Sequence, residues 1–149
     1  MKIMLDKGAY APTRAFAHDA GLDLYTPADV YVPRSAKSCS EAFRGIDIGS
    51  ATIDTGVHVE IPKGYVGFVK SKSGLNVKHG LTAEGVIDSG YTGSIVVKLY
   101  NHTSNDYAFE AGEKIAQLVL LPIITPELEQ VDSLEETERG SNGFGSSGK

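Results

Sequence analysis

The chain has 149 residues and a formal net charge of −5, with 41 % hydrophobic and 22 % charged residues. This length suits a single domain with a sizeable core, and the composition excludes an intrinsically disordered chain. The acidic balance and the lack of a basic tract argue against binding to a nucleic-acid backbone. A phosphate ligand would therefore have to be bound locally, by a few cations, backbone N–H groups or a metal.

Cysteine use and hydropathy indicate the compartment. Cys39 is the only cysteine, so no internal disulfide can form and a reducing environment is expected. The N-terminus lacks the charged-then-apolar pattern of a secretion signal, and no apolar run approaches membrane-spanning length. The sequence predicts a soluble, cytoplasmic protein that contacts no membrane.

Short segments rich in β-branched and aromatic residues follow one another along the chain, separated by glycine and proline turns. The predicted strands are Lys2–Leu5, Ala20–Tyr25, Val30–Val32, Ala51–Ile61, Tyr65–Lys70, the run ending at Ile87, Ser94–Tyr100 and Ile115–Leu121. Within 51–61 the odd-numbered apolar residues share one face, with a bulge or a turn at Thr55-Gly56. This pattern indicates an all-β domain with at most one short helix, between Leu75 and His79.

Three segments fall outside the strand pattern. Residues 34–50 are rich in Ser, Gly, Lys and Arg and are predicted to form an inserted loop. Pro122 and Pro126 bracket an extended arm, and residues 139–149 are nearly all Gly and Ser around Phe144. We expect a single domain over 1–138, with an arm at about 122–138, followed by a flexible segment over 139–149.

The stretch from Gly85 to Gly93 is the centre of the predicted chemistry. Gly90 can supply the positive φ of a tight loop, so the stretch is typical of a β-hairpin that holds Asp88 and Tyr91 near its tip. A carboxylate beside an aromatic ring could bind a planar ligand and deprotonate a water. The alternative, an aspartate that only bonds to its own turn, is favoured for this stretch taken alone.

Other candidate residues lie elsewhere. The alternation of 20–25 predicts that Asp23 is an exposed strand acid. Lys72, Ser73 and Gly74 offer a cation, a hydroxyl and a glycine for phosphate binding, or form only a polar connection. Gln117, among apolar residues, is either a satisfied core amide or a ligand contact.

Two other kinds of site are excluded. Gly143–Lys149 matches the spacing of a P-loop, but no helix can follow it and the final Ser/Thr is missing. The four histidines show no metal-binding spacing, so a zinc site is not expected. The lone Phe144 framed by glycines suits instead a tail that closes on a ligand, with Arg139 on its phosphates.

Five motifs in order resemble those of the homotrimeric dUTPases (dUTP diphosphatases) from end to end of the chain. They are Ala20-Gly21-Leu22-Asp23-Leu24, Lys72-Ser73-Gly74-Leu75, Gly85 to Gly93, Gly112-Glu113-Lys114-Ile115-Ala116-Gln117-Leu118, and Arg139 to Gly148. The resemblance implies a jelly-roll-like distorted β-barrel (a β-clip fold) that trimerises, with the C-terminal arm exchanged between subunits and active sites shared among them. It also implies hydrolysis of dUTP to dUMP and pyrophosphate, which limits uracil in DNA and supplies dUMP for thymidylate synthesis.

The resemblance also assigns roles to residues. Asp88 matches the base that deprotonates the attacking water, Ser73 the hydroxyl on the α–β bridging oxygen, and Gln117 the amide beside that water. Asp23 matches the acid that reaches a triphosphate-bound Mg²⁺ through water. The implied substrate contacts are Lys72, Ser73, Gly74, Gly85, Val86, Ile87, Asp88, Tyr91, Gln117, Arg139, Phe144, Gly145, Ser146 and Ser147. Tyr91 would pack under the deoxyribose and Phe144 over the uracil, as part of a lid over 139–149.

Two departures and one rival family bear on this assignment. Lys72 stands where the family usually has arginine, which keeps the charge but loses the bidentate fork. The segment 34–50 is longer than the usual connection. The related dCTP deaminases carry a catalytic glutamate in the strand after the hairpin, and Lys98 occupies that position here, which argues against deamination.

Overall fold

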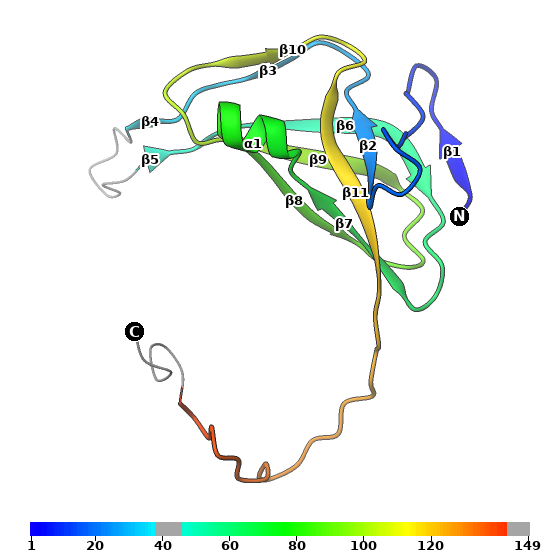
Figure 1. The fold of residues 1–149 in the computed structure, drawn as a ribbon, viewed down its shortest axis with the longest axis vertical. Helices are drawn as coiled ribbons and strands as arrows, with labels where there is room; N and C mark the ends of the chain where they lie inside the picture. Colours follow the sequence, from blue (N-terminus) through cyan, green and yellow to red (C-terminus); the bar gives the residue numbers. More distant parts are fainter. Residues whose placement is uncertain (38–45, 143–149) are drawn as a thin grey trace.

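The computed structural model describes residues 1–37 and 46–142. The chain forms strands joined by short turns, and one short helix (Figure 1). The strands are β1 (Ile3–Leu5), β2 (Gly21–Tyr25), β3 (Val30–Val32), β4 (Ala36–Lys37), β5 (Ile46–Asp47), β6 (Gly49–Val59), β7 (Tyr65–Lys70), β8 (Leu81–Ile87), β9 (Ser94–Asn101), β10 (Tyr107–Phe109) and β11 (Lys114–Pro122). The prediction of a mostly β domain is confirmed.

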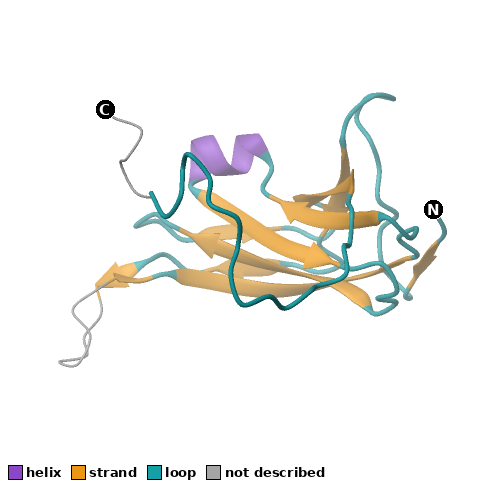
Figure 2. Ribbon diagram, turned by 90° about the horizontal axis from the view of Figure 1, so that it is seen from below, coloured by secondary structure: helices purple, strands orange, loops and turns teal. Residues whose placement is uncertain are grey.

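Seven strands form one curled sheet in the order β1-β6-β9-β8-β7-β11-β2, and every pairing in it is antiparallel. Strand β8 joins the two halves, because its first part pairs with β9 and its second part with β7. The sheet therefore curls into a half-barrel around a single core (Figure 2). The ribbon of β3 and β10 closes one end and contributes Val32 and Phe109 to that core.

Alternation along the strands accounts for the core. In β9 the side chains of Ile95, Val97 and Leu99 are buried, while those of Val96 and Lys98 face outward. In and after β6 the predicted inner face is confirmed, with all its members buried: Ile53, Val57, Val59 and Ile61. The register with β9 shifts between Asp54 and His58, which confirms the predicted bulge.

The helix α1 (Ser73–His79) begins two residues earlier than predicted. It ends at Gly80, which adopts the left-handed conformation with φ of 60° and donates its N–H to the Asn76 carbonyl. Lys78 and His79 occupy its last turn, where positive charge suits the helix dipole. No helix within the described residues is long and apolar enough to cross a membrane.

The prediction that 34–50 is only a loop is wrong at both ends of the segment. Strands β4 and β5 pair with each other, and β6 already begins at Gly49. A Cβ at Gly49 would lie 1.9 Å from the Pro33 carbonyl oxygen, so glycine is required for this close approach. The residues from 38 to 45, which include Cys39, lie outside the described part of the chain.

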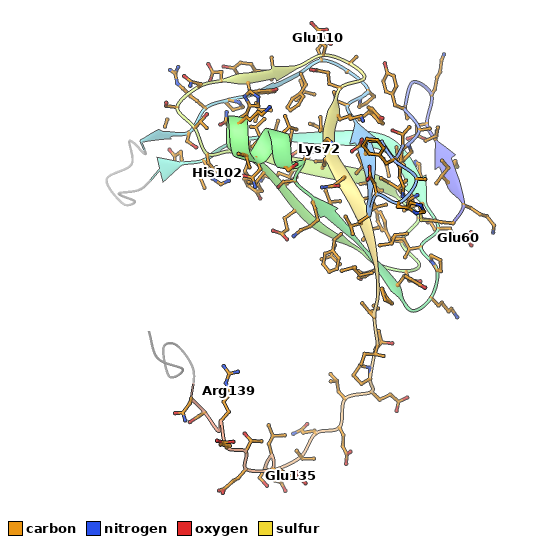
Figure 3. The ribbon with its side chains drawn as sticks, in the orientation of Figure 1. Glu60, Lys72, His102, Glu110, Glu135 and Arg139 are labelled. Atoms are coloured by element: carbon orange, nitrogen blue, oxygen red, sulfur yellow. The ribbon has the colours of Figure 1, made fainter. Side chains whose placement is uncertain are left out.

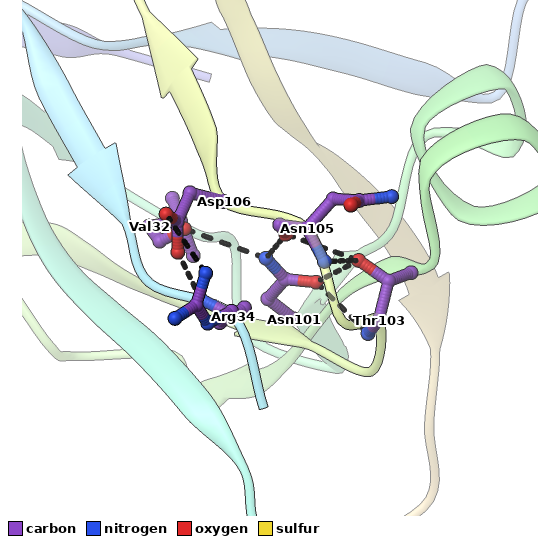
Figure 4. Close-up of polar contacts among 6 residues, drawn as sticks. All are labelled: Val32, Arg34, Asn101, Thr103, Asn105 and Asp106. Atoms are coloured by element: carbon purple, nitrogen blue, oxygen red, sulfur yellow. Dashed lines mark hydrogen bonds and ion pairs between the residues drawn. The ribbon is translucent and has the colours of Figure 1, made fainter. Parts of the chain in front are cut away.

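A buried amide secures the base of this insertion (Figure 4). Asn101 is fully buried; its Nδ2 donates to the carbonyls of Val32 (3.4 Å) and Asn105 (2.8 Å), and its Oδ1 accepts from Thr103 N (3.0 Å). Beside it, the backbone N–H of Arg34 donates to Asp106 Oδ1 at 2.9 Å. Loss of the amide would leave buried groups unpaired at a cost of about 1–3 kcal/mol each, so Asn101 is a structural residue.

After β11 the chain leaves the sheet as an extended arm (Figures 1 and 3). Its first contact is the N–H of Ile123, which donates to the Gly64 carbonyl at 2.8 Å. Further along, Ile124, Leu128 and Leu134 are 92 %, 98 % and 86 % exposed. The extended arm was predicted; its exchange between subunits stays a prediction.

Candidate active site

Asp23 is buried between two lysines, although its alternation predicted an exposed strand acid. Its side chain is 5 % exposed. Oδ1 accepts a hydrogen bond from Lys72 Nζ, and Oδ2 lies 2.6 Å from Lys114 Nζ. The prediction failed because both cations come from elements distant in sequence, the start of α1 and the start of β11.

The charges of this cluster are coupled. Burial by itself would raise the pKa of the Asp23 carboxyl, but hydrogen bonds from Lys114 and Lys72 outweigh it and hold the pKa below its usual value. The same hydrogen bond to Asp23 raises the pKa of Lys114. Asp23 is therefore a carboxylate at neutral pH, with both oxygens accepting from ammonium groups.

Gln117 lies next to this cluster. In β11 it pairs with Asp23 on one side and Lys70 on the other. Its Nε2 donates to the Ser71 carbonyl at 3.0 Å. A Cβ at Gly21 would lie 2.0 Å from its Oε1, so glycine is the residue that leaves room for the amide. The Gln117 amide is half-buried, and one of its N–H groups is hydrogen-bonded within the protein. This fits a structural role in the core, while the rest of the amide can still hydrogen-bond to a ligand.

The segment from Lys72 to Gly74 follows β7 and forms the start of α1, beside β11 (Figure 3). Ser73 and Gly74 are exposed in the first turn of the helix. Nothing lies within 4 Å of the position that a Gly74 Cβ would take. The predicted phosphate-binding segment is thus open to a ligand, with Lys72 held beneath it by Asp23.

The predicted hairpin is open rather than tight. Strand β8 pairs with β9 only from Leu81 to Ala83, and from Glu84 to Ile87 its partner is β7. The backbone edge of Gly85–Ile87 that faces away from β7 is therefore outside any described ladder. Its N–H and C=O groups can serve a planar polar ligand.

The loop from Asp88 to Gly93 is held by its own residues. Tyr91 N–H donates to the Asp88 carbonyl at 3.1 Å, and the Tyr91 hydroxyl donates to the Ser94 carbonyl at 3.0 Å. A Cβ at Gly93 would lie 2.3 Å from the tyrosine oxygen, so the ring packs directly on this glycine. Gly90 has the predicted positive φ, 95°. Asp88 and Tyr91 both remain exposed at this end of the sheet.

His58 also supports this loop, and sequence reasoning missed it because a lone histidine in a strand carries no signal. Its Nδ1 donates to the Thr92 carbonyl at 2.8 Å, and its Nε2 lies 3.3 Å from Asp6 Oδ2. The hydrogen bond to Thr92 and the nearby carboxylates of Asp6 and Asp54 raise the pKa of His58 above its usual value. The imidazole thus links the β1–β2 connection to the loop.

We expect His58 to stabilise the protein most at acidic pH. Because its pKa is raised on folding, the folded state binds the proton more tightly; the stabilisation is complete below about pH 6.5 and disappears as pH rises through the folded-state pKa. Thermal melting of wild type and His58→Gln at several pH values checks this. The difference in Tm should shrink as pH rises, and a constant difference would contradict the expectation.

The candidate residues form two groups, one at each end of strand β7. Gly67 pairs with Ile87, so the loop with Asp88 lies at the start of β7, whereas Lys72 follows the end of β7 (Figure 1). At about 3.3 Å per residue, the two ends lie on the order of 15 Å apart. The structure unites Asp23, Lys72 and Gln117 but leaves Asp88 and Tyr91 apart from them.

Of the substrate contacts predicted in the closing tail, only Arg139 lies in the described part of the chain. Arg139 lies on the arm, and its Nε donates to the Asn142 carbonyl at 3.3 Å. Phe144, Gly145, Ser146 and Ser147 lie outside the described residues.

No group of three or more metal-ligating side chains occurs within 1–37 and 46–142. Asp23 offers a single carboxylate, which is too few ligands for a metal held by the protein itself. It fits better a metal that is held by the phosphates of the ligand and that the carboxylate contacts through water.

Comparison with known proteins shows the family and the fold. The family model described as dUTPase matches residues 7–148. A deoxyuridine 5'-triphosphate nucleotidohydrolase of Yarrowia lipolytica is 40 % identical, covering 97 % of this chain and 85 % of that protein. The dUTPase of Staphylococcus bacteriophage 80alpha with dUPNHPP superposes with a TM-score of 0.83 at 34 % identity, covering 99 % and 98 % of the two chains. A mutant dUTPase from phage phi11 of S. aureus, whose description names a structural Mg(II) ion, has a TM-score of 0.74 at 29 % identity, covering 91 % of this chain and 98 % of that one.

The family model and the curated relatives define the class of protein, a hydrolase that acts on a nucleoside triphosphate. The chain belongs to the dUTPase family.

Proposed function

We propose that this protein hydrolyses dUTP to dUMP and pyrophosphate by attack of a water on the α-phosphorus. The observation that carries the proposal is the opening of β8 from β9 after Ala83, which frees the backbone of Gly85–Ile87. That edge suits the donor and acceptor pattern of uracil. The family membership supports the same reaction.

The loop beside this edge would bind the sugar and activate water. The Tyr91 ring, fixed over Gly93, would pack under the deoxyribose and leave no room for a 2′-hydroxyl. Asp88, exposed next to it, would accept a proton from the attacking water. In this role the carboxylate needs an accessible position within reach of the α-phosphorus, and its exposure supports that assignment.

The other group of residues would bind the phosphates. Ser73 and the Gly74 backbone would contact the bridging and β-phosphate oxygens, and Gln117 would orient the water with its unused amide capacity. Mg²⁺ bound to the triphosphate supplies charge neutralisation. Asp23, ionised by its two lysines, would accept a hydrogen bond from a water on that ion.

A complete site would need more than one copy of the chain, and we propose a homotrimer with shared sites. The roughly 15 Å between the two groups of residues supports this arrangement. The exposed Ile124, Leu128 and Leu134 support an arm that packs on a neighbouring copy, since apolar side chains on an extended segment call for a partner surface. Arg139 and residues 143–149 would then close on that neighbour's nucleotide.

We expect a strong preference for dUTP over UTP, dTTP and dCTP. Backbone groups that pair with uracil mispair with the cytosine edge, a tight slot rejects the 5-methyl group, and Tyr91 rejects the 2′-hydroxyl. Pyrophosphate release from each triphosphate, compared as kcat/KM, tests the proposal. Comparable values for dUTP and UTP would remove the role of Tyr91, and a lack of release from dUTP would overturn the reaction itself.

A further inference from the structure

A second basic feature lies beside the Lys72–Gly74 segment. A pocket of 510 Å³ opens between α1 and the turn that begins β11. This volume is within the range of small-molecule sites. Its lining includes Tyr25, Lys72, Gly74, Lys78, Glu113 and Lys114. Because Lys72 and Gly74 belong to the proposed phosphate segment, the pocket is a continuation of it.

The pocket concentrates positive charge in an acidic protein. Three lysines line it, whereas the whole chain has a net charge of −5. Lys72 and Lys114 share the single carboxylate of Asp23. The Glu113 carboxylate, also at the pocket, accepts the N–H of Glu110 at 2.7 Å. Within the part of the chain that the structure describes, no ion pair involves Lys78.

We propose that this pocket binds the terminal phosphates of the nucleotide, and that Lys78 selects a triphosphate over a monophosphate. The inference rests on the proposed dUTP reaction and assigns to it a residue outside the expected substrate contacts. Lys78 extends from the last turn of α1, whose first turn carries Ser73. A chain of phosphates that starts at Ser73 and enters the pocket passes from the bridging oxygen to the β- and γ-phosphates.

The chemistry of a lysine side chain fits a role in binding the terminal phosphates. An ammonium group is a compact point charge that suits a terminal phosphate with several equivalent oxygens. Anchoring the terminal phosphates holds the bond to be broken in one place relative to the attacking water. A nucleoside monophosphate lacks the groups that reach the pocket, so Lys78 contributes nothing to its binding.

Calorimetric titration of full-length Lys78→Gln with dUMP and with the non-hydrolysable α,β-imido analogue of dUTP tests the proposal. The experiment is run at fixed Mg²⁺ and ionic strength, because charged contacts are screened by salt. We expect Kd for the imido analogue to rise about tenfold and Kd for dUMP to change less than about twofold. Lys78→Arg, which keeps the charge, should restore most of the affinity for the analogue.

Lys63→Gln is the matched control, because it removes one charge from an exposed turn at the other end of β7; it should leave both Kd values unchanged. Equal losses for dUMP and the analogue, or no loss for either, would overturn the role of Lys78. Inorganic pyrophosphate, added as a competitor, should displace the analogue from the wild-type protein. It should also bind less tightly to Lys78→Gln than to wild type. Equal affinity of pyrophosphate for the two proteins would also overturn the role of Lys78. Failure of wild type to bind either nucleotide would refute the proposed function instead.

Discussion

Replacement of Asp88 by Asn is expected to lower kcat by about 10²–10⁴-fold while dUTP binding is largely kept. The amide has the shape of the carboxylate but cannot accept the proton of the attacking water. Folding should be unaffected, because the Asp88 side chain is exposed and the described contact that Asp88 makes with Tyr91 uses its backbone carbonyl. Steady-state kinetics with dUTP, together with the Kd of the imido analogue, separate the two effects.

Glu84→Gln provides the matched control for this experiment. Glu84 is an exposed carboxylate of β8, the strand that ends just before Asp88, and its described ion pair is with Lys70. Its change to an amide should leave kcat within about twofold, as surface ion pairs contribute little. Near-normal turnover in Asp88→Asn would mean that another group is the base.

Mixing two inactive variants is expected to restore activity, because the two groups of site residues lie at opposite ends of β7 and β8. Asp88→Asn damages one end and Ser73→Ala the other, so each variant alone should be nearly inactive. After co-refolding at equal amounts, a shared site draws each end from a different copy. About a quarter of the wild-type activity should return, since each contributing copy carries its intact residue half of the time.

The control mixture combines Asp88→Asn with Asp88→Ala, which damage the same end and should stay inactive together. Light scattering on each sample reports whether the oligomer has formed. Recovery in neither mixture, with the oligomer intact, would show that Asp88 and Ser73 of one copy act in the same site, against the shared-site proposal.

Local pattern in the sequence determined the strands and most turns. Alternation in 94–101 needs only neighbouring residues to specify which side chains are buried, and Ile95, Val97 and Leu99 are buried as expected. The bulge at Thr55-Gly56 and the positive φ of Gly90 were likewise predictable, because glycine is the residue that tolerates such backbone. The five motifs indicated the family for a related reason, since each is short and contiguous.

Contacts between distant segments were decided only by the tertiary structure. Asp23 became a buried carboxylate because Lys72 and Lys114 meet it from two other elements, and no alternation pattern contains that information. The hairpin opened after Ala83 because β9 separates from β8 there while β7 pairs with the opposite edge of β8, which depends on the curl of the whole sheet. His58 reached Thr92, and Lys78 joined Lys72 and Lys114 around one pocket, for the same reason. Local sequence sets which backbone conformations are low in energy. Ion pairs and the pairing partners of strands depend instead on the packed fold, which brings remote residues together.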